Sequence, residues 1–175
     1  MNQIIFSMIF ATCATPLTLG AQAETTVKKA QAELSPTQGN RAKGIVTFTE
    51  VDKGVEIVAE MVGLTPGLHG FHIHEYGDCS APDGSSAGGH FNPDHTKHGG
   101  PDSKERHVGD LGNIKADLSG VGHYHRIDTQ IKLTGPDSII GRSLVVHAKP
   151  DDYKTQPTGN SGARVACGVI TEMEE

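Results

Sequence analysis

The residues of this sequence that can do chemistry are mostly histidines gathered in one part of the chain. They are His72, His74, His90, His98 and His107, followed by Asp110 and, further on, His147. Imidazole and carboxylate groups bind transition metals. Because the segment from Gly70 to Glu75 alternates like a β-strand, His72 and His74 point to the same face and can bind one ion together. The spacing predicts two metal sites that share one ligand.

Loops must bring the other ligands to this strand. The segment from about 77 to 106 is rich in Gly, Pro and Asn, which predicts irregular structure, and it carries His90, His98 and His107. A second long connection is expected from about 148 to 162. Loops of this length in a compact domain are usually functional. We therefore expect bound metal to order the first loop.

Alternating apolar residues predict the strands that support these loops. Residues 45–51 and 55–61, joined by a turn at 52–54, predict a β-hairpin. No segment has a convincing helical period, and the eight strands together predict an all-β barrel or sandwich with two long functional loops. The other strands are expected near 25–34, 69–76, 110–118, 123–133, 142–148 and 163–171.

Six motifs in this order resemble those of the copper/zinc superoxide dismutase family, over nearly all of the chain beyond its first two dozen residues. The resemblance implies the Greek-key topology of that family. The motifs are Gly-Leu-His-Gly-Phe-His-Ile-His-Glu at 67–75, Gly-His-Phe-Asn-Pro at 89–93, Lys-His-Gly-Gly-Pro at 97–101, His-Val-Gly-Asp-Leu-Gly-Asn at 107–113, Leu-Val-Val-His at 144–147 and Gly-Ala-Arg-Val-Ala-Cys-Gly-Val-Ile at 162–170.

The resemblance implies one copper and one zinc ion per subunit. Copper would be bound by four histidines, His72, His74, His90 and His147, and zinc by His90, His98, His107 and Asp110. Neutral nitrogen donors suit Cu(II), which favours a tetragonal arrangement with an open axial position. Three nitrogens and one carboxylate suit tetrahedral zinc in a structural role. His90 would then bridge the two ions.

The same resemblance implies the reaction and its supporting residues. Superoxide would be dismuted to dioxygen and hydrogen peroxide, with His90 and Arg164 as catalytic residues, since the Arg164 guanidinium can hold an anion beside copper. Asp151 would orient one histidine of each site. One alternative is a copper chaperone or metal-storage module on the same fold. Another is a structural zinc domain, which would leave His72, His74 and His147 unexplained.

Four histidines are expected to bind no metal. His69 matches a family position that makes a backbone hydrogen bond, and His95 is expected to be a solvated loop residue. His123 and His125 lie outside the family pattern. Their spacing could bind an adventitious ion, but we expect them to lie on a solvated strand face.

Residues 1–23 predict a signal peptide, and residues 24–175 the mature domain. Residues 1–23 contain no Lys, Arg, Asp or Glu, begin with an apolar run and end in Ala21-Gln22-Ala23, a pattern typical of signal-peptidase sites. The apolar run is too short to span a bilayer, and lipid modification of Cys13 stays an alternative. The predicted location is the periplasm, without stable membrane association.

With Cys13 in the signal peptide, Cys79 and Cys167 remain. Two cysteines in a secreted protein most simply pair, and the resemblance implies the same disulfide. The position of Cys79 directly after Gly77-Asp78 resembles the bacterial periplasmic branch of the family. Two buried free thiols are the alternative.

Charge and composition bear on the partners. The net charge of −6 lies wholly beyond residue 23 and argues against nucleic acid as a partner. Superoxide is the partner that the resemblance implies. Members of the family that the chain resembles occur as monomers and as homodimers, and no apolar patch in the sequence decides between these two states.

Overall fold

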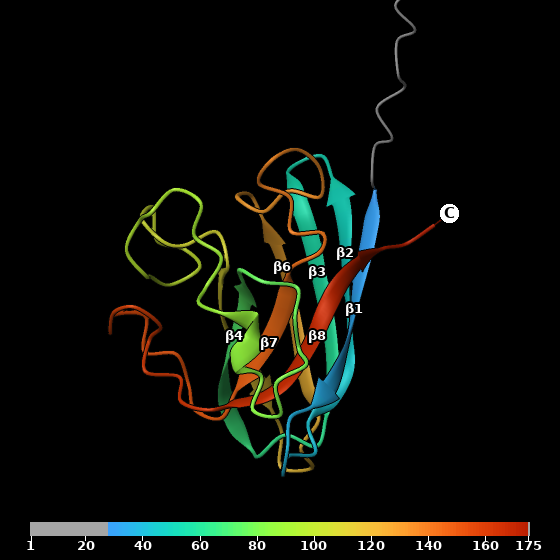
Figure 1. Cartoon of the computed structure of the whole chain (residues 1–175), viewed down its shortest axis with the longest axis vertical. Coiled ribbons are helices and arrows are strands. Elements are labelled where there is room, and N and C mark those ends of the chain that lie inside the picture. The colour runs from blue at the N-terminus through green and yellow to red at the C-terminus, as the bar shows by residue number, and fades with distance from the viewer. Residues whose placement is uncertain (1–27, 175) are drawn as a thin grey trace, which may run out of the picture.

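A computed structural model describes residues 28–174, which form one closed β-barrel (Figure 1). Its strands are β1 (Lys29–Pro36), β2 (Lys43–Val51), β3 (Gly54–Val62), β4 (Gly67–His74), β5 (Asp110–Ala116), β6 (Gly122–Asp128), β7 (Ser143–His147) and β8 (Arg164–Glu172). The signal peptide predicted at 1–23 lies outside the described residues. Within them, no helix is long and apolar enough to cross a membrane.

The strand order around the barrel is β1-β2-β3-β6-β5-β4-β7-β8, and every pairing is antiparallel. The prediction of an all-β fold with eight strands is confirmed. Because the sheet closes on itself, the fold is a barrel and not an open sandwich. The described residues contain one short 3-10 helix, Ser85–Ala87, inside the first long loop.

Alternation along the strands explains the core. In β3 every second residue is buried, including Ile57 with no exposed surface, and in β2 the alternating residues Val46 and Phe48 are buried. The strand β4 differs, since its last six residues are all buried. Phe71 and Ile73 belong to the hydrophobic core, so His72 and His74 point away from it, to the face of β4 that the long loops cover.

Two irregularities in the sheet lie at metal-ligand candidates. The register between β4 and β5 shifts between Gly70 and His72, and that between β7 and β8 shifts between Val146 and His147. Bulges of this kind re-aim side chains and occur often next to active sites. Here they turn His72 and His147 toward the region between the loops.

The two predicted loops are present, between β4 and β5 and between β7 and β8, and both lie on the side of the barrel formed by β4 and β7 (Figure 1). The prediction of a strand over 123–133 was wrong at its end. Strand β6 stops at Asp128, whose carboxylate accepts the backbone N–H groups of Gln130 and Ile131. These N–H groups therefore bond to the Asp128 side chain in place of a neighbouring strand. Residues 129–142 form a third long connection, between β6 and β7.

Candidate metal centre

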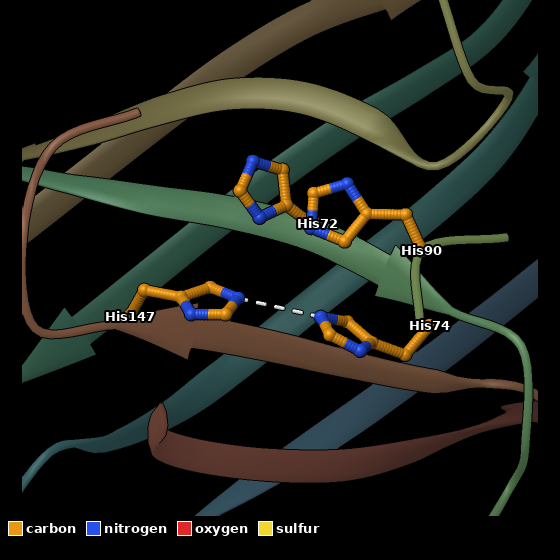
Figure 2. Close-up of side chains that lie close together, drawn as sticks. All are labelled: His72, His74, His90 and His147. Atoms are coloured by element: carbon orange, nitrogen blue, oxygen red, sulfur yellow. Dashed lines mark hydrogen bonds between the residues drawn. The ribbon is translucent and has the colours of Figure 1, made fainter. Parts of the chain in front are cut away.

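The first cluster consists of His72, His74, His90 and His147, all buried. Strand β4 supplies the first two, the long loop supplies His90 and the end of β7 supplies His147 (Figure 2). One nitrogen of each ring lies within 4.8 Å of the others, and Nε2 of His74 is 3.3 Å from Nε2 of His147. An isolated β-bridge between His74 and His90 fastens the loop to the end of β4.

The opposite ring nitrogens have protein acceptors. Nδ1 of His74 donates to the carbonyl oxygen of Gly88 at 3.0 Å, and Nδ1 of His147 donates to that of Gly162 at 3.1 Å. Nε2 of His72 donates to Asp151. These bonds select the tautomer that leaves the inward nitrogen with a free lone pair, which is the form that binds metal.

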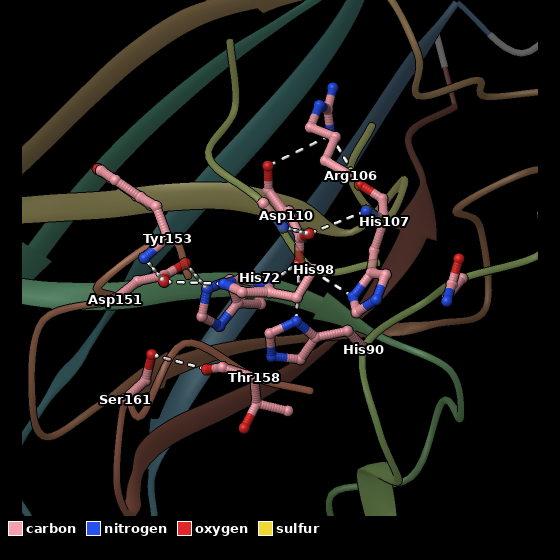
Figure 3. Close-up of polar contacts among 12 residues, drawn as sticks. His72, His90, His98, Arg106, His107, Asp110, Asp151, Tyr153, Thr158 and Ser161 are labelled. Carbon is pink, nitrogen blue, oxygen red and sulfur yellow. Dashed lines mark hydrogen bonds and ion pairs between the residues drawn. The ribbon is translucent and has the colours of Figure 1, made fainter. Parts of the chain in front are cut away.

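The second cluster consists of His90, His98, His107 and Asp110, also buried (Figure 3). Oδ1 of Asp110 lies 2.8 Å from Nδ1 of His90, 3.0 Å from Nδ1 of His98 and 3.3 Å from Nδ1 of His107. The other oxygen of Asp110 accepts the backbone N–H groups of Gly99 and His107. A tetrahedral zinc ion with bonds of about 2.0 Å would separate its ligands by about 3.3 Å, so the cluster fits zinc.

Unpaired nitrogens give an independent test of this fit. Buried ring nitrogens without a hydrogen-bond partner include Nδ1 of His72, His98 and His107 and Nε2 of His90. Leaving such atoms unpaired in the interior is costly, and each lies in one of the two clusters. Metal ions would satisfy them. His90 belongs to both clusters, with Nδ1 facing Asp110 and Nε2 facing the histidine cluster.

Asp151 lies between the clusters, as the resemblance implied. Its Oδ2 accepts Nε2 of His72 at 2.8 Å and its Oδ1 accepts Nε2 of His98 at 2.9 Å. The carboxamide of Asn113 in turn holds the backbone of Asp151 through its N–H and its C=O. The sequence reasoning quoted Asn113 within a motif but gave it no role.

Arg164 begins β8 and pairs in register with His147. Its guanidinium donates to the carbonyl oxygens of Gly84 and Gly88 in the first loop. Its positive charge is among the causes that lower the pKa of His74 and of His147, so it acts on the histidine cluster. The arginine side chain is half-buried.

Burial is the main cause of the pKa shifts in the histidine cluster. It lowers the pKa of His90 and of His147 to about 3, and that of His74 well below its usual value. For His98, burial acts in the same direction, but the nearby carboxylates of Asp110 and Asp151 outweigh it and raise the pKa to about 9. The neutral imidazoles of the first cluster are in the state that metal binding requires.

A buried ion pair, missed in the sequence, anchors the loop below the second cluster. Arg106 donates to both carboxylate oxygens of Asp128 at 2.8 and 2.6 Å, and to the carbonyl oxygens of His107, Val108 and Asp110. It therefore fixes the turn that presents His107 and Asp110. The position of Arg106 directly before a ligand histidine was the available signal.

The four remaining histidines lie outside both clusters. The buried ring of His69 lies between the carbonyl oxygens of Thr65 and His147. His95, His123 and His125 are exposed, and His125 pairs with Glu56 at 2.9 Å.

The disulfide between Cys79 and Cys167 joins the first loop to β8, with 5.8 Å between the Cα atoms. Both cysteines pack with Ala87 and Val145 beneath the loop. The bond thus fixes the loop segment that carries Gly84 and Gly88 against the strand that carries Arg164.

Comparisons with known proteins agree with this geometry. The profile of the family described as copper/zinc superoxide dismutase (SODC) matches residues 42–170. The chain is 48% identical over 145 residues to the superoxide dismutase [Cu-Zn] of Onchocerca volvulus, covering 76% of this chain and 90% of that protein. It is 48% identical over 149 residues to the extracellular superoxide dismutase [Cu-Zn] of Brugia pahangi, covering 79% of this chain and 73% of that protein.

A solved structure agrees as well. The crystal structure of the clock protein EA4 superposes with a TM-score of 0.80 at 45% identity, over 87% of this chain and 99% of that one. The family match over residues 42–170 spans β2 to β7, most of β8 and both loops that carry the two clusters. This chain belongs to the copper/zinc superoxide dismutase family.

Proposed function

We propose that this protein dismutes superoxide, with copper held by His72, His74, His90 and His147 and zinc by His90, His98, His107 and Asp110. The observation that carries the proposal is His90, whose two ring nitrogens face two different buried ligand sets. A single metal-storage site would not need this arrangement. The fold and the family membership of the chain support it.

Copper in this ligand set would supply the one-electron redox chemistry by which one superoxide is oxidised to dioxygen and a second, with two protons, is reduced to hydrogen peroxide. The residues of the chain handle the anion and the protons. The guanidinium of Arg164 attracts and orients superoxide by charge-assisted hydrogen bonding. Nε2 of His90 can hold a proton on the side facing the substrate. Asp151 keeps His72 and His98 in their ligand orientation.

Arg164 also weighs against a copper chaperone or storage module on the same fold. Such a module needs the ligands but has no use for a half-buried guanidinium beside the histidine cluster. In this chain the arginine is held in place by two loop carbonyl groups. The enzyme is therefore the better reading of the site.

The predicted compartment is supported only in its coarser form. A disulfide suits an oxidising compartment, and one relative is named extracellular. We propose secretion after cleavage behind Ala23. The two nematode relatives lend no support to the bacterial periplasmic branch, and the periplasm stays a prediction. The oligomeric state, monomer or homodimer, also stays a prediction.

The decisive experiment combines metal analysis with kinetics. Protein reconstituted with copper and zinc should bind one ion of each per chain and consume superoxide, followed by pulse radiolysis. Protein loaded with zinc alone is the control and should be inactive. Full loading with both metals without superoxide consumption would refute the proposed activity and favour metal storage.

A further inference from the structure

His98 occupies an unusual position among the ligand candidates, because it lies in loop backbone without strand neighbours. The residue is buried, with 4% of its surface exposed. Among the described residues, no backbone–backbone hydrogen bond outside the strands involves its N–H or its C=O. Buried backbone groups need partners, since an unpaired one costs as much as a lost hydrogen bond. The partners of His98 must therefore be side chains.

Both partners come from Gln156 in the second loop. Its Oε1 accepts the N–H of His98 at 2.9 Å, and its Nε2 donates to the C=O of His98 at 2.9 Å. One carboxamide thus replaces the strand neighbour that His98 lacks. Gln156 itself is exposed on the outside of the loop and covers the backbone of the buried histidine.

The second loop is folded so that it presents this carboxamide. Asp152 accepts the backbone N–H groups of Lys154 and Thr155 and the hydroxyl of Thr155. The N–H of Gly159 donates to the carbonyl of Thr155, which closes the turn around Gln156. From the same loop, Asp151 accepts the ring Nε2 of His98 at 2.9 Å. The loop therefore holds His98 at three points, one on the ring and two on the backbone.

We propose that Gln156 is a positioning residue for the zinc ligand His98, through which the second loop controls how tightly the zinc cluster retains its ion. The inference rests on the proposed function, because it takes the second cluster as the zinc site. Asp151 hydrogen-bonds one histidine of each cluster, whereas the only ligand candidate that Gln156 hydrogen-bonds within the described residues is His98; its remaining bond goes to the carbonyl oxygen of Lys154. Loss of Gln156 should therefore affect zinc retention and leave copper retention nearly unchanged.

Gln156→Met tests this, since methionine has a similar length but offers neither the donor nor the acceptor. Cobalt(II) serves as the probe of the zinc cluster because its visible absorption reports ligand geometry. We expect Gln156→Met to lose cobalt to a chelator about tenfold faster than the wild type, in line with the removal of two neutral hydrogen bonds. Its cobalt absorption band should also change in shape.

Gln31→Met is the matched control, since Gln31 is exposed on β1 and makes no side-chain hydrogen bond within the described residues. It should release cobalt like the wild type. Copper retention of Gln156→Met should match that of the wild type, which separates positioning of His98 from general stabilisation of the fold.

Cobalt release and absorption unchanged in Gln156→Met would overturn the inference while leaving the proposed function intact. A lowered thermal midpoint of the metal-free variant, with faster loss of copper and cobalt alike, would also overturn it, because Gln156 would then stabilise the fold in general. A wild-type protein that takes up no cobalt would refute the zinc site, and the inference with it.

Discussion

His74 and Arg164 donate to the same atom, the carbonyl oxygen of Gly88. The first is a proposed copper ligand on β4 and the second the proposed anion-binding residue on β8. Gly88 adopts a φ of 75°, a conformation that favours glycine, and a Cβ there would lie 2.5 Å from side-chain atoms of Glu75 and Tyr76. The loop thus sets the distance between ligand and arginine through one backbone group.

Charge reversal at Arg164 should reduce capture of the anion. We expect Arg164→Glu to lower kcat/KM for superoxide at least about tenfold, equivalent to about 1.4 kcal/mol in the barrier. Arg164→Lys keeps the charge but cannot reach both carbonyl groups in the same way, so it should retain more activity. Stopped-flow or pulse-radiolysis rates on fully metallated variants check this. A charge-reversed variant as fast as the wild type would remove Arg164 from the mechanism.

The wild-type rate should depend on salt. If a local positive field guides superoxide to the site, kcat/KM should fall as ionic strength rises and the Debye length shrinks to about 10 Å and below. The same series on Arg164→Glu should show a weaker or inverted dependence. A wild-type rate that stays constant across the salt series would argue against electrostatic guidance.

Removal of Asp151 should weaken both metal sites together. Its carboxylate orients His72 in one cluster and His98 in the other, so Asp151→Ala should lower the affinity for both metals by about 10–100-fold. Metal content after competition with a chelator measures the effect. Asp52→Ala, in the exposed turn between β2 and β3, is the control and should retain both ions. Unchanged occupancy in Asp151→Ala would contradict the assigned role.

The disulfide should contribute to stability and to the order of the first loop. Closing a loop of 88 residues restricts the unfolded chain by up to about 4–5 kcal/mol on the chain-entropy model. Cys79→Ser should therefore unfold at a clearly lower temperature and lose metal more readily. Thiol titration of unreduced, unfolded wild type should find no free thiol from this pair. Two titratable thiols would show that the bond does not form.

The metal-free protein should be most stable near pH 6.5. The folded-state pKa of His90 and of His147 is about 3, so the unfolded chain binds more protons as the pH falls below about 6.5, and stability is lost toward pH 3. His98 acts in the opposite direction. Its folded-state pKa of about 9 adds stability below pH 6.5 that is lost as the pH rises through 9. Denaturant unfolding at a series of pH values measures the loss of unfolding free energy on each side of pH 6.5. An unfolding free energy that does not change with pH would contradict these pKa shifts.

The sequence by itself predicted eight strands, most of them near their observed positions, and it supplied the ligand candidates. Alternation places His72 and His74 on one face of β4 whatever lies around them, because the side-chain period of a strand is two residues. The motifs supplied the remaining ligand candidates, and the clusters contain each of them. Local pattern also predicted the hairpin of β2 and β3 within two residues at each end.

Only the tertiary structure decided what holds these residues in place. Asp128 binds Arg106, Gln156 pairs with the backbone of His98, and Asn113 pairs with the backbone of Asp151. These contacts join residues 22 to 58 positions apart, and neither alternation nor turn chemistry reaches that far. The reason is physical. A buried backbone group in an irregular loop must find its partner wherever the folded chain brings one close, and that proximity exists only after the barrel has closed.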